Sequence, residues 1–172
     1  MGIFSSNSYG DSMHYGEAFA LWSYLMGTKD MVTSCQTLMN HTGDADLFKV
    51  LEDIMQEAQR EEAEVEQLLK EHGVSLPPSP AEKPYSDLES IPVGARFNDS
   101  EIAGAISKSV AASLVACSQA MAQCTREDIG MLFGQYHTNK AQISTRLLRL
   151  NKDKGWLVMP PIHDHIPQTV TV

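Results

Sequence analysis

The sequence GVSLPPSPAEKPYSDLESIPVGARF, residues 73–97, decides the fold because no helix can pass through it. It contains five of the eight prolines of the chain, and each proline inside a helix costs about 3 kcal/mol. An irregular segment of this length within a domain needs a geometrical role. Extended at about 3.1 Å per residue, it reaches up to roughly 75 Å, whereas a helix of about 28 residues is about 42 Å long. The segment can therefore cross from one end of a helical bundle to the other.

Helical periodicity flanks this crossover on both sides. Apolar residues recur at helical spacing over residues 14–40 and 45–72 before it, and over residues 100–124 and 126–154 after it. A tail follows at residues 155–172. Two antiparallel hairpins joined by one long connection are typical of an all-α, ferritin-like four-helix bundle. We therefore expect one ferritin-like domain over residues 1–172.

Residues at the predicted turns match helix caps. In the first turn, Gly43 favours a left-handed helix end and Asp44 is placed to cap the second helix. Gly73 follows the second helix as its C-terminal cap. Residues 98–101 and 125–128 match capping boxes that open the third and fourth helices.

The third predicted helix is rich in small residues. Ala and Ser fill the gaps between its apolar positions, and no charged residue occurs from Ser109 to Thr125. Because small side chains allow close packing, we expect this helix to be the innermost of the four. The uncharged run falls short of the roughly 20 apolar residues that span a membrane. It therefore predicts a buried helix and no membrane insertion.

Charge and cysteine content narrow the classes of partner. A net charge of -9 and a pI near 5.0 argue against nucleic acid or anionic membrane, which both require a basic surface. The three cysteines form no CxxC pair and lie on apolar stripes, so we expect buried, reduced thiols. The first residues carry no basic region followed by an apolar core, which predicts that no signal peptide directs secretion. A cytoplasmic localisation fits these features.

A ferritin-like bundle raises the question of a dinuclear metal centre. Such a centre uses a Glu-x-x-His motif on each of two helices, and the sequence contains none. Glu61 is the best inward-facing acid, but Lys140 lies near the matching line of the fourth helix and would compete with a cation. We expect either a Glu61–Lys140 ion pair or a Lys140 side chain that extends to solvent. His137 beside Glu61 is an alternative ligand, and the tail residues 163–165 (His-Asp-His) form a weak chelating pair.

His14 and Glu17 lie one turn apart at the polar start of the first helix. In the predicted bundle, residues 126–128 and 71–72 should lie near them. These residues could form a mononuclear site for Fe, Mn or Zn, or a hydrogen-bonded network that ties helix ends together. The network is the favoured interpretation, because two ligands do not make a metal site.

Several motifs together resemble a known family. They are HYGE (14–17), NHTGD (40–44), IPVGARFND (91–99), REDI (126–129), FGQYH (133–137) and LRLNKDKGW (148–156). They look like a family of uncharacterised proteins found mainly in endospore-forming bacteria and often described as similar to spore coat protein F. The resemblance implies a ferritin-like unit, which many members carry twice in tandem, and a sporulation or coat context. It implies no activity; the signature positions that it suggests as functional are His14, Glu17, Asn40, His41, Asp44 and His137.

Three functional hypotheses follow. The first is a non-enzymatic structural or interaction protein of spores, which pairs as a homodimer because a single copy of a commonly doubled unit is expected to pair; spore coat proteins would be its partners. The second is a metal-binding protein, an oxidase or a metal handler, with a non-standard site. The third is a small-ligand binder with a pocket between methionine-containing helices.

Overall fold

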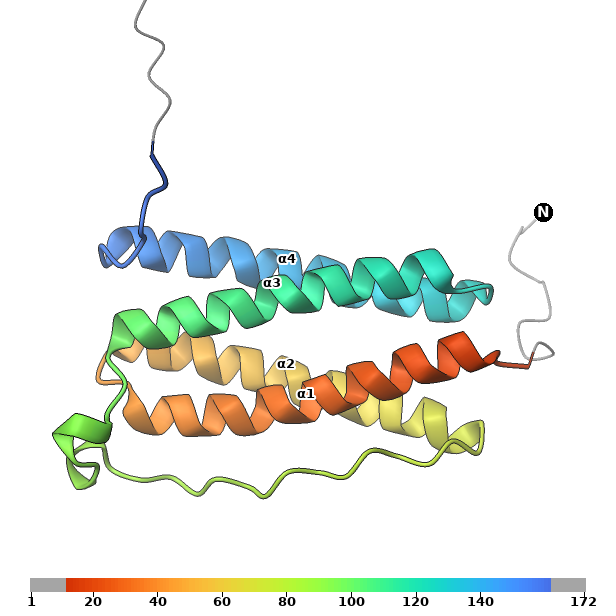
Figure 1. The fold of residues 1–172 in the computed structure, drawn as a ribbon, viewed down its shortest axis with the longest axis horizontal. Helices are drawn as coiled ribbons and strands as arrows, with labels where there is room; N and C mark the ends of the chain where they lie inside the picture. The colour runs from red at the N-terminus through yellow and green to blue at the C-terminus, as the bar shows by residue number, and fades with distance from the viewer. Residues whose placement is uncertain (1–11, 162–172) are drawn as a thin grey trace, which may run out of the picture.

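The computed structural model describes residues 12–161 and contains four long helices in that range. They are α1 (Tyr15–His41), α2 (Ala45–Glu71), α3 (Asp99–Gln123) and α4 (Glu127–Asp153). Each end differs from the expected one by a single residue or none. Two short 3-10 turns, η1 (Leu88–Ser90) and η2 (Val93–Ala95), lie late in the crossover. The four helices form one elongated bundle (Figure 1).

The proline-rich crossover runs along α1, as Figure 1 shows. Lys29 Nζ lies 2.7 Å from Ser79 Oγ, and the Lys83 amide donates to Gln36 Oε1 at 2.9 Å. Nearer the end of α1, the Asn40 side chain donates to the Pro84 carbonyl at 3.0 Å. It also accepts a hydrogen bond from the Ser86 amide at 3.0 Å. The crossover therefore follows the length of the bundle, which confirms the connection predicted from the prolines.

The crossover delivers α3 to the turn between α1 and α2. There, Asp99 Oδ1 accepts hydrogen bonds from Thr42 Oγ1 at 2.6 Å and from the Gly43 amide at 3.3 Å. α3 then returns toward the start of α1, and α4 runs back beside α3 (Figure 1). Helices α1 and α3 are consequently antiparallel neighbours, and so are α2 and α4.

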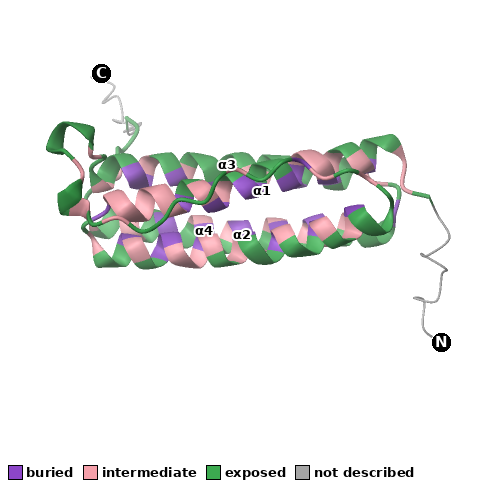
Figure 2. Ribbon diagram, turned by 90° about the horizontal axis from the view of Figure 1, so that it is seen from below, coloured by how far each residue is buried: buried purple, intermediate pink, exposed green. Residues whose placement is uncertain are grey.

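The buried core is divided into two apolar clusters with polar side chains between them. One cluster lies toward the α1–α2 turn and includes Leu47, Leu51, Ile106 and Leu147. The other lies toward the α3–α4 turn and includes Leu21, Leu69, Ile129 and Phe133. Figure 2 shows the resulting buried positions along the facing sides of the helices. The polar layer between the clusters is the centre of the candidate site.

Two local expectations for the helix ends have different outcomes. Gly73 adopts a φ of +71°, so it caps α2 as predicted, and the capping box of Asn98 and Glu101 is present at the start of α3. The prediction that Gly43 adopts a left-handed conformation is wrong. The chain leaves α1 in an extended conformation at Thr42, and among the described glycines only Gly73 and Gly155 have positive φ. The hydrogen bonds that Thr42 and the Gly43 amide donate to Asp99 hold this turn instead.

The expectation that α3 is the innermost helix is also wrong. The segment Val93–Gln123 is apolar and long enough by composition to cross a membrane, a test that core helices also pass, but only 28% of its apolar window is buried. α3 packs through one narrow stripe that includes Ile106, Val110 and Cys117, and Val115 on another face is 67% exposed. Beyond Lys108, small residues on the remaining surface leave α3 with an uncharged outer face.

The three cysteines are free, and the two at positions 35 and 117 are buried as expected. Cys124, at the end of α3, is only partly buried. Burial raises the pKa of the Cys35 thiol to about 12, so this thiol stays protonated and unreactive at neutral pH.

Candidate functional site

The centre of the polar layer is an ion pair between α2 and α4. Lys140 Nζ lies 2.6 Å from both carboxylate oxygens of Glu61. Glu61 is 2% exposed and Lys140 is 6% exposed. Both residues occupy gaps in the apolar stripes of their helices, so packing of the stripes forces them together. The ion pair expected from the sequence is therefore present, and the alternative in which Lys140 extends to solvent is wrong.

Tyr24 of α1 completes this group. Its hydroxyl donates to Glu61 Oε2 at 2.9 Å, and its ring stacks on Tyr136 of α4 with the centroids 5.3 Å apart. Phe133 meets the ring of Tyr24 edge-on at 5.4 Å. The ring packing places the Tyr24 hydroxyl against the carboxylate and links α1 to the pair formed by α2 and α4.

Burial perturbs the acids in this layer. Removal from water raises the pKa of Glu61 above its ordinary value, and the Lys140 ammonium opposes this rise without cancelling it. Burial and the adjacent Glu61 carboxylate raise the pKa of the Tyr24 phenol far above its ordinary range. Tyr24 is therefore a permanent hydrogen-bond donor, and it cannot serve as a base at neutral pH.

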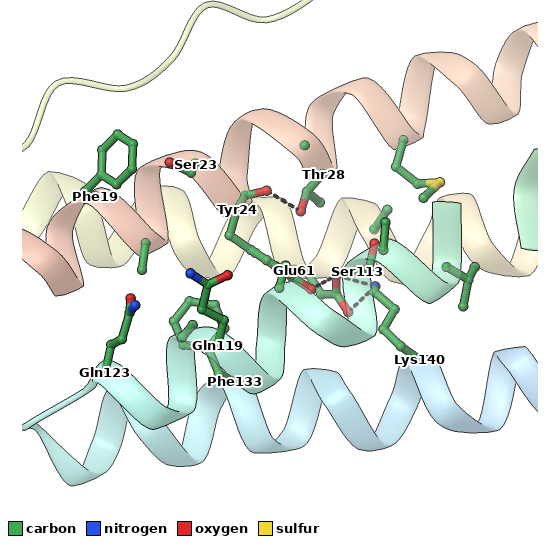
Figure 3. Close-up of a pocket in the computed structure, with 18 of the residues that line it drawn as sticks. Phe19, Ser23, Tyr24, Thr28, Glu61, Ser113, Gln119, Gln123, Phe133 and Lys140 are labelled. Carbon is green, nitrogen blue, oxygen red and sulfur yellow. Dashed lines mark hydrogen bonds and ion pairs between the residues drawn. The ribbon is translucent and has the colours of Figure 1, made fainter. Parts of the chain in front are cut away.

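A cavity of about 420 Å³ opens between α1 and α3 and reaches this polar layer. Figure 3 shows Tyr24, Glu61 and Lys140 in its lining, with Phe133 from α4 beside them. Gln119 and Gln123, both exposed on α3, line the cavity nearer the surface. A volume of this size lies in the range of small-molecule sites.

The residues of the polar layer do not fit the dinuclear metal centre that such a bundle can hold. That centre needs several inward carboxylates and two histidines, whereas both oxygens of Glu61 already face the ammonium of Lys140. A metal ion bound to Glu61 would have to displace the buried Lys140 ammonium from the carboxylate that pairs with it. Within residues 12–161, no three His, Cys, Asp or Glu side chains lie together in an arrangement that could hold a metal ion.

Glu17 is the second buried acid, and it joins two helix starts. It is 1% exposed, and its Oε1 accepts the amides of Thr125 at 2.7 Å and Arg126 at 2.8 Å as well as the Thr125 hydroxyl at 3.0 Å. Its Oε2 accepts the His14 amide at 3.1 Å, while His14 Nδ1 accepts the amides of Gly16 and Glu17. Glu17 thus closes a capping box on α1 and also caps α4.

This arrangement corrects the capping box predicted within residues 125–128. The N-cap of α4 is Arg126, which makes no side-chain capping hydrogen bond. The free amides at the start of α4 are satisfied by Glu17, more than a hundred residues away in sequence. A carboxylate supplied by another helix accepts several donors at once, so the local Thr125 hydroxyl donates to it and does not act as a cap.

The helix-end network predicted around His14 extends to α2. Arg126 Nη1 lies 2.7 Å from His72 Nε2, and the Arg126 guanidinium pairs with both carboxylate oxygens of Asp128 at 3.0 and 2.6 Å. His14 Nε2 lies 3.5 Å from Glu17 Oε1. The first ligand pair suggested for a mononuclear metal is therefore engaged at the start of α1, where Glu17 binds the start of α4, and Arg126 links α4 to the end of α2.

The other candidate residues hold the opposite end of the bundle. Asn40 binds the crossover, and His41 Nδ1 accepts the Phe97 amide at 3.3 Å. Asp44 caps α2 as predicted and pairs with Lys154 at 2.6 Å. The lysine and the capping amides hold the pKa of Asp44 below its ordinary value.

Two further candidate positions lie apart from these clusters. His137 lies on α4 outside them and does not line the cavity. The tail pair at 163–165 lies outside the described residues.

Two buried residues of α1 with polar groups, Tyr24 and Lys29, were not predicted as site residues from the sequence. Tyr24 lies on the buried face between Leu21 and Leu25. Lys29 is also buried and pairs with Glu66 at 2.7 Å and Glu62 at 3.8 Å. For Lys29, the available signal was a gap in the apolar stripe of α1 between positions 25 and 32. Tyr24 lies outside this gap, among apolar residues, so the stripe carried no comparable signal for it.

Comparison with known proteins supplies the family. The model of a family described as "Protein of unknown function (DUF3231)" matches residues 1–168. The chain belongs to the DUF3231 family. The uncharacterized protein YvdQ of Bacillus subtilis (strain 168) is 50% identical over 163 residues, which cover 95% of this chain and 96% of YvdQ. These matches confirm the family resemblance found in the sequence motifs.

Solved structures agree with this assignment. A "putative spore coat protein" from Bacillus halodurans C-125 shares 44% identity with this DUF3231 chain and has a TM-score of 0.90, covering 92% of this chain and 99% of that one. A two-domain protein from Anabaena variabilis with DJ-1/ThiJ/PfpI-like and ferritin-like domains has a TM-score of 0.66 at 14% identity. It covers 92% of this chain and 42% of that one. The ferritin-like, all-α fold is thereby confirmed.

Removal of the buried ammonium tests the central ion pair. We expect Lys140→Met to lower the free energy of unfolding by about 3–5 kcal/mol at neutral pH, because it leaves Glu61 charged and unpaired. The unpaired carboxyl binds a proton more tightly folded than unfolded, so the loss should shrink as the pH falls toward about 4.3. Urea unfolding as a function of pH measures both effects. The double variant Glu61→Leu/Lys140→Met should recover most of the stability; equal losses in both variants would contradict the ion pair.

The contribution of Glu17 to stability should also depend on pH. Burial alone would raise its pKa, but the amides of Arg126, Thr125 and His14 outweigh burial and hold the pKa below its ordinary value. Its contribution is therefore full above about pH 4.3, the unfolded value, and is lost as the pH falls through the folded value. We expect Glu17→Gln to cost about 1.5–3 kcal/mol at neutral pH, with a smaller difference from wild type in acid. A difference independent of pH would argue against an ionised Glu17.

Proposed function

We propose that this protein is a non-catalytic, ferritin-like structural or interaction protein of spores. The observation that carries the proposal is the Lys140 ammonium 2.6 Å from both oxygens of Glu61, which occupies the place where the fold could present a carboxylate to metal. The relative named a "putative spore coat protein" shares 44% identity along nearly its whole length, which supports the spore context. Spore coat proteins are accordingly the proposed partners.

Two measurements test the spore role and the absence of metal chemistry. An antibody against the chain should detect it in extracts of purified spores from the host organism. Elemental analysis of protein purified without chelators should find well under one transition metal ion per chain. Absence from spores would contradict the first half of the proposal. A stoichiometric metal that is lost in folded His137→Ala would contradict the second half and support a metal-binding protein with a non-standard site.

We also propose that the protein forms a homodimer through the outer face of α3. Val115 is 67% exposed there, and Ala111, Ser118 and Ala122 lie at helical spacing on the same exposed face. A net charge of -9 makes two copies repel each other, so the part of this face beyond Lys108, which carries no charge, offers the least costly approach. Small side chains on α3 allow the two helices to pack closely.

A charge placed on this face tests the dimer. Wild-type protein should elute as a dimer in size-exclusion chromatography with light scattering, and Val115→Glu should elute as a folded monomer because it buries an unpaired carboxylate at the interface. Ala63→Glu is the matched control, since it adds the same charge at an exposed position of α2 and should remain dimeric. A wild-type monomer at high concentration, or equal effects of both variants, would contradict the proposal.

A further inference from the structure

We infer that the cavity between α1 and α3 binds a small, uncharged, largely apolar molecule that carries one hydroxyl- or amide-type group. This inference is independent of the proposed structural role. It rests on the walls of the cavity, the hydrogen-bonding capacity of its floor and the small residues at its mouth.

The walls of the cavity are largely apolar and come from all four helices. They include Phe19 and Met31 of α1, Ile54 of α2, Val110 of α3 and Phe133 of α4. A well-packed core would fill a space of about 420 Å³ with side chains, because protein interiors are close-packed. A cavity of that size with apolar walls and a few converging polar groups is the usual form of a small-molecule site.

Among residues 12–161, the groups of the floor leave one hydrogen-bond donor and one acceptor without a partner. An ammonium has three N–H groups, and Lys140 makes two hydrogen bonds, both to Glu61. The Oε2 atom of Glu61 accepts from Tyr24 and Lys140, whereas Oε1 accepts from Lys140 alone. Because Lys140 and Glu61 both line the cavity, a ligand group that accepts one hydrogen bond and donates another would complete the layer.

The charge of the floor selects an uncharged ligand. Glu61 and Lys140 neutralise each other, and both are more than nine-tenths buried. A carboxylate or ammonium on the ligand would add an unpaired charge to this desolvated layer, which is strongly unfavourable. A hydroxyl or primary amide can both donate and accept without adding charge.

Glycine at the mouth keeps the cavity open. Gly27 lies in the middle of α1, lines the cavity and has no atom within 4 Å of an added Cβ. Glycine inside a helix is unfavourable compared with alanine, so neither packing nor helix propensity explains it. Gly104 of α3 is also inside a helix with open space around its Cβ position, but it does not line the cavity. The two glycines therefore form a matched pair for substitution.

The binding experiment uses N-phenyl-1-naphthylamine, an uncharged aromatic probe with one N–H group whose fluorescence rises in an apolar site. Wild-type protein should bind the probe saturably with one site per chain. Gly27→Leu should weaken binding at least about tenfold, which is 1.4 kcal/mol, whereas Gly104→Leu should bind as wild type does. Both variants should keep the wild-type thermal midpoint or exceed it. Ala116→Trp, which narrows the same mouth from α3, is a second blocking variant and should also weaken binding.

Displacement of the probe by three ligands that share one alkyl tail and differ in their head group tests the chemistry of the floor. At pH 7, 1-octanol should displace the probe at a concentration at least about tenfold lower than octanoate or octylammonium. Preference for either charged ligand, absence of saturable binding, or equal binding by folded Gly27→Leu would overturn the inference. A wild-type dimer that excludes the probe and is dissociated by Gly27→Leu would also overturn it, because a second copy would then cover the cavity.

Discussion

The structure depends on the ion pair between Glu61 and Lys140 in the middle of the bundle. Two charges removed from water are costly unless each satisfies the other with good geometry. Here one ammonium lies at equal distance from both carboxylate oxygens, and Tyr24 supplies a further donor. α2, α4 and α1 must therefore hold one register relative to one another, because a shift of any one would leave a buried charge or donor without its partner.

The same pair separates the core into two apolar clusters and shapes the space between them. Each cluster packs one end of the bundle, and the polar layer prevents their fusion. Where α1 and α3 pass this layer, glycine and small residues leave a cavity unfilled. In other proteins a bundle of this kind can present carboxylates to metal ions. In this protein it presents the Glu61–Lys140 pair, whose charges cancel, and such a pair suits an uncharged ligand better than a metal ion.

Long-range hydrogen bonds fix both ends of the bundle. At one end, Glu17 of α1 caps α4, and at the other, Asp99 of α3 holds the turn after α1. Asp44 and Lys154 connect the start of α2 to the end of α4. The crossover makes this arrangement possible, since it carries the chain along α1 and starts α3 beside the α1–α2 turn. Beyond Lys108, α3 is left with an uncharged outer face because its narrow buried stripe uses only part of its apolar surface.

Local rules were sufficient for much of this structure. Helix positions, the crossover, the Asn98 capping box and the Gly73 cap follow from the sequence, because proline, glycine and capping residues act within a few residues of their own position. The Glu61–Lys140 pair was also predictable, since both residues occupy gaps in otherwise apolar stripes. Only the tertiary structure decided which acid caps α4, why Gly43 is not left-handed, how exposed α3 is, and that Tyr24 and a cavity join the central pair. Each of these depends on the distance between helices and on side chains supplied from more than thirty residues away, which periodicity along one helix does not encode.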